Sequence, residues 1–269
     1  MLTLVAVFGF TSMVFANSEV DEEEIEAKLL DMGFTEEQID LLSDAIKPEL
    51  AKEADKGAQV VSFKHTEIKE SNLPKGEFKG EFETLAQISP STLYLNLTIL
   101  DYGIGSNNWN KRKIYSDFKW LKAPFWKLTD QIAIAWADGW NIVNNSDALV
   151  YQYRGERTGR LYTVYYYDGQ YTPEAGVHFD SLDLKELVPD GSEHTKDHSG
   201  WATIEIGRYV NQTRENDTER TDVLTKYFHK NTSIGLSGSI SITGGPSITI
   251  THQNNYDWAQ DLTYFDWPR

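Results

Sequence analysis

The stretch Ser233-Ile-Gly-Leu-Ser-Gly-Ser-Ile-Ser-Ile-Thr-Gly-Gly-Pro-Ser-Ile-Thr-Ile-Thr251 alternates between two kinds of side chain. A period of two is typical of β-strands, whose successive side chains point to opposite faces. The aliphatic face comprises Ile234, Leu236, Ile240, Ile242, Ile248 and Ile250, and the other face is mostly Ser and Thr. Keeping all these aliphatic residues on one face requires a loop with an odd number of residues. The three residues 244–246 satisfy that condition, so we predict a two-faced hairpin that pairs Ile242 with Ile248.

The rest of the chain after Gly57 has similar alternation in shorter pieces. Asp-Gly turn signals separate several of them, and no helical crossover pattern lies between them. The strand-like stretches are residues 93–99, 132–136, 161–167, 202–208 and 223–228. The sequence therefore predicts one mostly β domain over residues 57–269, an antiparallel β-sandwich or a barrel-like variant of it.

Residues 17–56 have a different pattern and are predicted to form an acidic helical segment. Acidic residues 21–24 suit the first turn of a helix, and Gly33 suits the left-handed position after its end. Thr35 and Gln38 have the spacing of a capping box, which predicts a second helix from Thr35 to about residue 46. Pro48 fits the first turn of a short third helix.

The first 16 residues form an apolar run that ends in Val14-Phe-Ala16, with small residues at the positions that signal peptidase recognises. No Lys or Arg precedes the run, which departs from the usual signal peptide. The run is shorter than the roughly 20 residues of a membrane-spanning helix. We therefore expect residues 1–16 to be a signal peptide and the protein to be secreted, in an extracellular location.

The chain contains no cysteine, which is uncommon for an exported protein of this length and fits a Gram-positive bacterial exoprotein. A signal peptide, short acidic helices with a Gly-Phe-Thr turn and the Ser/Ile hairpin occur together here. In this combination the chain resembles uncharacterised exported proteins of bacillus-type Gram-positive bacteria. That resemblance implies a location and carries no assigned activity.

Charge and motifs narrow the function. The formal net charge of −16 argues against nucleic acid as a partner, because a phosphate backbone requires a positive surface. No nucleophile elbow, phosphate-binding loop or dinucleotide fingerprint is present, and the cofactor, if there is one, stays unknown. We therefore favour an extracellular or cell-envelope interaction protein without catalytic activity over an enzyme.

Aromatic residues are the first candidate for a binding site. Flat rings offer a large contact area at small entropic cost, and exposed ones can stack against a cell-surface glycan or another envelope component. The candidate ligand-binding residues are Trp109, Trp120, Trp126, Tyr165 and Tyr167. About half of the rings on strands should instead point inward and fill the core, so only an exposed group of rings indicates binding.

A metal site is the second candidate and supports the alternative of a metal-dependent or carboxylate-based hydrolase. His178, Asp180, His194 and His198 lie close together in the sequence and carry suitable ligand atoms. The four-residue spacing of His194 and His198 brings two side chains together only on a helix. Residues 190–200 have the composition of a polar loop, which favours solvent-exposed histidines over a metal site.

The hairpin over 233–251 gives a third alternative, a membrane-active protein. Its division into an aliphatic and a hydroxyl face is the pattern of hairpins that β-barrel pore-forming toxins insert into membranes. Its strands are at the short limit of the roughly 9–11 residues that a spanning strand needs. Hairpins of ordinary sandwiches also alternate in this way, so we expect the isoleucines to face a protein core.

Overall fold

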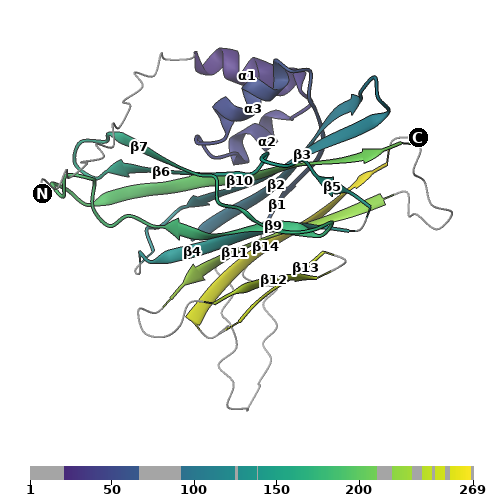
Figure 1. Cartoon of the computed structure of the whole chain (residues 1–269). Helices are drawn as coiled ribbons and strands as arrows, with labels where there is room; N and C mark the ends of the chain where they lie inside the picture. Colours follow the sequence, from purple (N-terminus) through teal and green to yellow (C-terminus); the bar gives the residue numbers. More distant parts are fainter. Residues whose placement is uncertain are drawn as a thin grey trace, which may run out of the picture.

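The computed structural model describes residues 21–66, 92–124, 127–137, 139–210, 220–231, 238–243, 246–251 and 255–267. Over these residues the protein is mostly β, with antiparallel sheets and three short helices near the N-terminal end, which confirms the predicted fold class. Figure 1 shows the layers: helices, two sheets and a small hairpin. The predicted signal peptide lies outside the described residues. No helix within the described ranges is long and apolar enough to cross a membrane.

The helices are α1 (Glu22–Asp31), α2 (Glu36–Leu41) and α3 (Lys47–Ala54). The capping box is present, since the backbone N–H of Gln38 donates to Thr35 Oγ1 and the N–H of Thr35 donates to Gln38 Oε1. Gly33 has φ +103°, the left-handed conformation expected after α1. The helix α2 ends earlier than predicted because Leu42 turns extended and the next residue, Ser43, bonds to a strand.

Two antiparallel sheets form the body. Sheet A has the order β1 (Gln59–His65), β2 (Leu93–Ile104), β3 (Trp109–Trp120), β10 (Thr195–Tyr209), β6 (Ala148–Gly155) and β7 (Leu161–Tyr166), with β5 (Asn141–Ile142) also pairing with β10. Sheet B has the order β14 (Tyr256–Asp266), β11 (Arg220–Lys230), β4 (Thr129–Trp136), β9 (Gly176–Asp183) and β8 (Gln170–Thr172).

The main core lies between the two sheets. Alternate residues of each strand point into it, such as Leu95, Leu97 and Ile99 of β2 and Ile132 and Ile134 of β4. Large aromatic side chains fill the remaining space, as expected for a chain with 13% aromatic residues. The outer faces of both sheets therefore remain to be covered by other elements.

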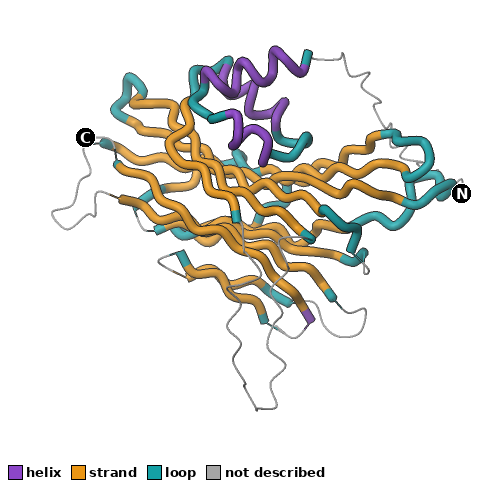
Figure 2. The backbone as a smooth tube through the Cα atoms, turned by 180° about the vertical axis from the view of Figure 1, so that it is seen from behind, coloured by secondary structure: helices purple, strands orange, loops and turns teal. Residues whose placement is uncertain are grey.

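The helices cover part of the outer face of sheet A (Figures 1 and 2), and we call α1–α3 the helical cover. The hairpin of β12 (Ile240–Thr243) and β13 (Ser247–Ile250) covers the outer face of sheet B, and we call it the hairpin cover. Ile242 pairs with Ile248, which confirms the predicted register, and all four isoleucines of these strands are buried. Ile234 and Leu236 lie outside the described residues.

Candidate ligand-binding groove

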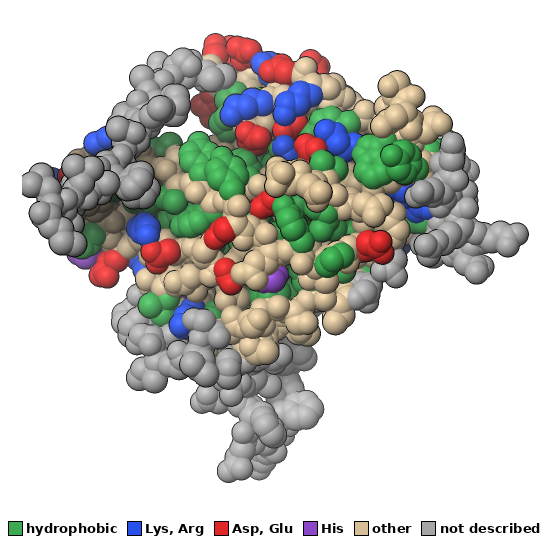
Figure 3. Space-filling model, viewed as in Figure 1, with side chains coloured by type: hydrophobic (Ala, Val, Ile, Leu, Met, Phe, Trp, Pro, Cys, Tyr) green, Lys and Arg blue, Asp and Glu red, His purple; other side chains and the backbone are tan. Residues whose placement is uncertain are grey.

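The helical cover leaves the β6–β7 side of sheet A open. A groove of about 450 Å³ lies there, between α3 and the outer face of strands β10, β6 and β7. Its floor is formed by outward-facing side chains of these strands, and α3 forms one wall. Its lining includes Glu49, Lys52, Lys113, Asp147, Gln152, Thr163, Tyr165, Tyr167 and Trp201. Figure 3 shows hydrophobic side chains on this side of the molecule beside charged ones of both signs.

Two tyrosines form the exposed edge of the groove. The alternation of β7 sends Val164 and Tyr166 toward the main core and leaves Tyr165 and its second neighbour Tyr167 on the outer face. Tyr165 is 60% exposed and Tyr167 72% exposed, which is unusual for large rings. Their rings are nearly parallel, with 5° between the planes and 6.5 Å between the centroids. The pair presents flat aromatic surface to solvent.

A single row of paired residues connects these tyrosines to the floor. Tyr165 is opposite Val150 of β6, and Val150 is opposite Trp201 of β10. Val150 and Trp201 are buried, because they also pack against the helical cover. Trp201 in turn contacts the ring of Tyr115 edge to face, with 5.6 Å between centroids. The apolar part of the groove is therefore packed against the helical cover.

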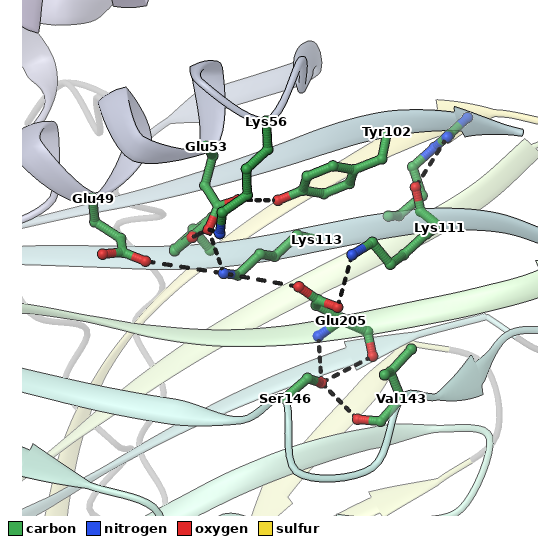
Figure 4. A network of polar contacts seen from close by, with 11 residues as sticks. Glu49, Glu53, Lys56, Tyr102, Lys111, Lys113, Val143, Ser146 and Glu205 are labelled. Atoms are coloured by element: carbon green, nitrogen blue, oxygen red, sulfur yellow. Dashed lines mark hydrogen bonds and ion pairs between the residues drawn. The ribbon is translucent and has the colours of Figure 1, made fainter. Parts of the chain in front are cut away.

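The wall on the α3 side is fixed by ion pairs and hydrogen bonds (Figure 4). Lys113 Nζ lies 2.7 Å from Glu53 Oε1 and 4.0 Å from both Glu49 Oε1 and Glu205 Oε1. The hydroxyl of Tyr102 donates to Glu53 Oε2 at 2.5 Å. Burial by itself raises the pKa of Glu53, but the bonds from Lys113 and Tyr102 outweigh it and lower the pKa to about 2. Glu53 is thus a carboxylate that anchors the helix.

The opposite end of the groove is held by the loop that precedes β6. Asp147 accepts hydrogen bonds from the backbone N–H of Gly169, at 3.0 Å, and from the hydroxyl of Tyr171. Ser146 donates to the carbonyl of Val143 at 2.6 Å and accepts from the N–H of Glu205 at 2.9 Å. These contacts already satisfy most of the polar atoms at this end.

Gln152 and Thr163 differ from these fixed groups. Within the described part of the chain, neither side chain has a hydrogen-bond partner. Both lie on the groove side of their strands, and they are register partners across β6 and β7. An amide and a hydroxyl are consequently available to a ligand beside the tyrosines. The charged side chains in the lining are Glu49, Asp147, Lys52 and Lys113, two of each sign, so the groove favours a neutral ligand.

The other predicted aromatic residues lie elsewhere. Trp120 is only 5% exposed and belongs to the main core, where its Nε1 donates to Tyr227 Oη at 3.2 Å. It is therefore a core residue because the even positions of β3 point between the sheets. Trp109 is half-buried and packs edge to face on Tyr209 at 4.6 Å. Trp126 lies outside the described residues.

The four residues of the predicted metal site are divided between the sheets. His178 and Asp180 lie on β9 of sheet B, whereas His198 lies on β10 of sheet A and His194 just before it. Extended backbone at about 3.3 Å per residue separates His194 from His198. In the described parts of the chain, no group of three or more His, Asp or Glu side chains is placed to hold a metal ion. The structure therefore does not assemble these residues into a metal site.

The histidines have separate environments. His198 is fully buried, with Nδ1 2.6 Å from the hydroxyl of Tyr151, and burial followed by the charge of Lys127 lowers its pKa to about 4. Burial also lowers the pKa of His178, which Asp180 only partly opposes. Asp180 accepts a hydrogen bond from Gln170 at 2.9 Å, and His194 is exposed. The buried ring of His198 and the half-buried ring of His178 are therefore held in the neutral form.

Comparison with known proteins adds little to this picture. No family model matches the chain, and no curated protein matches it. Among solved structures, one described as a pore forming protein has a TM-score of 0.37 at 8% identity, covering 78% of this chain and 92% of its own. Another, described as AvmM, which catalyses macrocyclization in alchivemycin A biosynthesis, has a TM-score of 0.26 at 12% identity, with 65% and 89% covered. Similarity at these levels carries no argument about function.

Proposed function

We propose that this protein is an exported, non-catalytic binding protein that holds a neutral glycan of the cell envelope in the groove beside β7. One observation carries the proposal: Tyr165 and Tyr167 present parallel, exposed rings at the edge of a groove whose charges balance. Solvent-exposed aromatic rings of this size signify a contact surface when they form a contiguous group.

The chemistry of the lining matches a polyhydroxylated ligand. The C–H face of a sugar ring can lie on an aromatic ring, where it buries apolar surface. The side chains of Gln152 and Thr163, which have no hydrogen-bond partner among the described residues, can exchange hydrogen bonds with its hydroxyl groups. A groove open at one side also accommodates a chain of several sugar units, rather than a single enclosed molecule.

Export is part of the same proposal. The apolar run of residues 1–16 and the complete absence of cysteine support it. A secreted protein with a rigid β scaffold and a shallow aromatic groove is suited to hold on to surface polysaccharide. The cell-envelope partner named in the proposal follows from that location.

The proposal is tested with a glycan array, followed by calorimetric titration of the best neutral oligosaccharide. Tyr165→Ala and Tyr167→Ala are each expected to weaken binding about five- to thirtyfold, because each removes one stacking surface worth on the order of 1–2 kcal/mol. Tyr264→Ala is the matched control, since Tyr264 is 48% exposed on β14 of the other sheet.

Two outcomes would contradict the proposal. One is an array without any neutral glycan bound above background. The other is an equal loss of binding in Tyr264→Ala and Tyr165→Ala, which would place the ligand away from the groove. Circular dichroism of each variant excludes a general loss of folding.

A further inference from the structure

The hairpin cover belongs to an unusually long uncharged part of the chain. Between Lys230 and Asp257 there are 26 residues without any Asp, Glu, Lys or Arg, although a quarter of the whole chain is charged. At that frequency about six charged residues are expected in the interval. The solvent-facing positions of the hairpin are hydroxyl residues instead: Ser241, Thr243, Ser247 and Thr249. Solubility alone does not call for this composition, because other surface strands of the same protein carry charges.

The hairpin cover is also joined to the body differently from the other strands. Within the described residues, β12 and β13 pair with each other and form a two-stranded sheet of their own. Among the described residues, hydrogen bonds join this segment to sheet B at Gly238, whose N–H donates to Tyr256 Oη and whose carbonyl accepts from Gln131 Nε2, both at 2.9 Å. The remaining attachment is apolar packing, which has no directional requirement.

The surface beneath the hairpin combines small residues with the larger side chains of Leu224, Phe228 and Tyr256. Ala133 and Ala135 of β4 and Ala175, next to β9, lie in the cluster that the isoleucines complete. Gly176 is in close contact with the hairpin, because a Cβ at that position would lie 2.8 Å from Ile242 Cδ1. Departure of the hairpin would expose these small side chains together with Leu224, Phe228 and Tyr256. The main core would stay closed, since Ile132 and Ile134 of the same strand face the other side.

We infer that the hairpin cover can leave sheet B and dock its isoleucine face into the apolar part of a lipid bilayer. Insertion into the hydrocarbon buries again the apolar surface that the hairpin exposes when it leaves the protein, which is that of Ile240, Ile242, Ile248 and Ile250. The hydroxyl face carries no charge that would have to be dehydrated at the membrane. The net charge of −16 favours a zwitterionic bilayer over an anionic one, which would repel the protein.

This activity is separate from the proposed glycan binding. The groove is lined by α3 and the outer face of sheet A. The helices lie over sheet A and the hairpin lies on the far side of sheet B (Figures 1 and 2). A protein with both would hold polysaccharide on one side and lipid on the other. Tyr165→Ala is therefore expected to bind vesicles like the unchanged protein, so the two proposals can fail independently.

The test ties the hairpin to the body. The chain has no cysteine, so an introduced pair carries the only thiols. The first cysteine replaces Ser241, the neighbour of Ile242, in Ser241→Cys. The second replaces Thr172, in Thr172→Cys, because Thr172 is the register partner of Gly176 and Gly176 lies close to Ile242. A short, reducible thiol cross-linker joins the two, and mass spectrometry confirms the link. Ser241→Cys with Thr249→Cys is the matched control, because these register partners link the hairpin only to itself.

Binding is measured by flotation with phosphatidylcholine vesicles at neutral and at mildly acidic pH. We expect the tied protein to bind at least tenfold less than the cross-linked control and to recover when the link is reduced. Ile248→Thr, which keeps β-branching but adds a hydroxyl, should bind about tenfold less than the unchanged protein. Equal flotation of the tied and control proteins would overturn the inference. So would an unchanged protein that does not float with phosphatidylcholine vesicles at either pH.

Discussion

The outer face of sheet A is covered by helices and the outer face of sheet B by a hairpin, and the contacts beneath the two covers differ in kind. Beneath the helical cover, the N–H of Ser43 donates to Asp117 Oδ2 at 2.9 Å, and Lys113 pairs with Glu53. Beneath the hairpin cover, the isoleucines belong to an apolar cluster with alanines, Leu224 and Phe228, and hydrogen bonds are formed at Gly238. A buried charged or polar contact holds its element in one position, because a buried group that loses its partner destabilises the protein. Apolar packing allows an element to exchange one apolar surface for another.

The difference suggests why both covers exist on one scaffold. The helical cover forms a wall of the candidate groove, and a binding wall must keep its position. The hairpin cover forms no part of that groove. The contacts that attach the hairpin can therefore be less specific without any effect on the groove. The hairpin cover is then available for a second role.

The largest expected effect comes from breaking an anchor of the helical cover. Glu53→Leu leaves Lys113 buried without its nearest carboxylate, and we expect the free energy of unfolding to fall by about 3–5 kcal/mol. Urea denaturation followed by circular dichroism measures this free energy. Glu24→Gln is the control: Glu24 forms an exposed pair with Lys28 at 3.0 Å, and its loss should cost less than about 1 kcal/mol. Equal costs in the two variants would show that the anchor is unimportant.

A smaller and more local effect is expected at the hairpin cover. Ile248→Ala removes buried volume and should weaken docking of the hairpin by about 2–4 kcal/mol. Hydrogen exchange of the β12 and β13 amides should become about 30-fold faster or more, while exchange in β10 stays unchanged. Thr249→Ala, on the exposed face, should change neither the docking of the hairpin nor the exchange rates of these amides. Faster exchange throughout β10 in Ile248→Ala would mean that the hairpin is an integral part of the sandwich.

The smallest effect is a pH dependence confined to the helical cover. The folded state lowers the pKa of Glu53 to about 2, below its ordinary value of 4.5, so Glu53 stabilises the fold fully above pH 4.5. This stabilisation is lost as the pH falls from 4.5 toward 2. The stability difference between the unchanged protein and Glu53→Gln should therefore shrink over that range. A difference that stays constant or grows on acidification would contradict the assigned pKa. Exchange at the uncharged β12–β13 amides serves as the internal reference.

Local sequence patterns predicted the structural features that depend on residues close together in the chain. The capping box at Thr35, the left-handed Gly33 and the register of Ile242 with Ile248 depend on neighbouring residues, and all three are confirmed. The end of α2 was wrong because a distant side chain, that of Asp117, holds Ser43. Alternation predicted that the isoleucines face a core, but not that this core is a separate cluster outside the sandwich.

The site was predicted in part. Tyr165 and Tyr167 were among the candidates, and their parity relative to Tyr166 was the signal for exposure. Trp120, another of the candidates, is buried in the main core and does not line the groove. Trp201, Gln152 and α3 join the tyrosines only through long-range strand order, which brings β10, β6 and β7 together although β10 comes later in the chain. Sequence periodicity contains no information about that order.

The position of Glu53 has a consequence for how a ligand would meet the groove. Glu49 and Lys52, which line the groove, lie within one turn of Glu53 on the same helix. The wall is thus set before any ligand arrives. Association should involve little reorganisation, so that affinity depends on the number of sugar units in contact, and the rate of binding should be close to that of a rigid receptor. A longer oligosaccharide would then gain mainly in residence time.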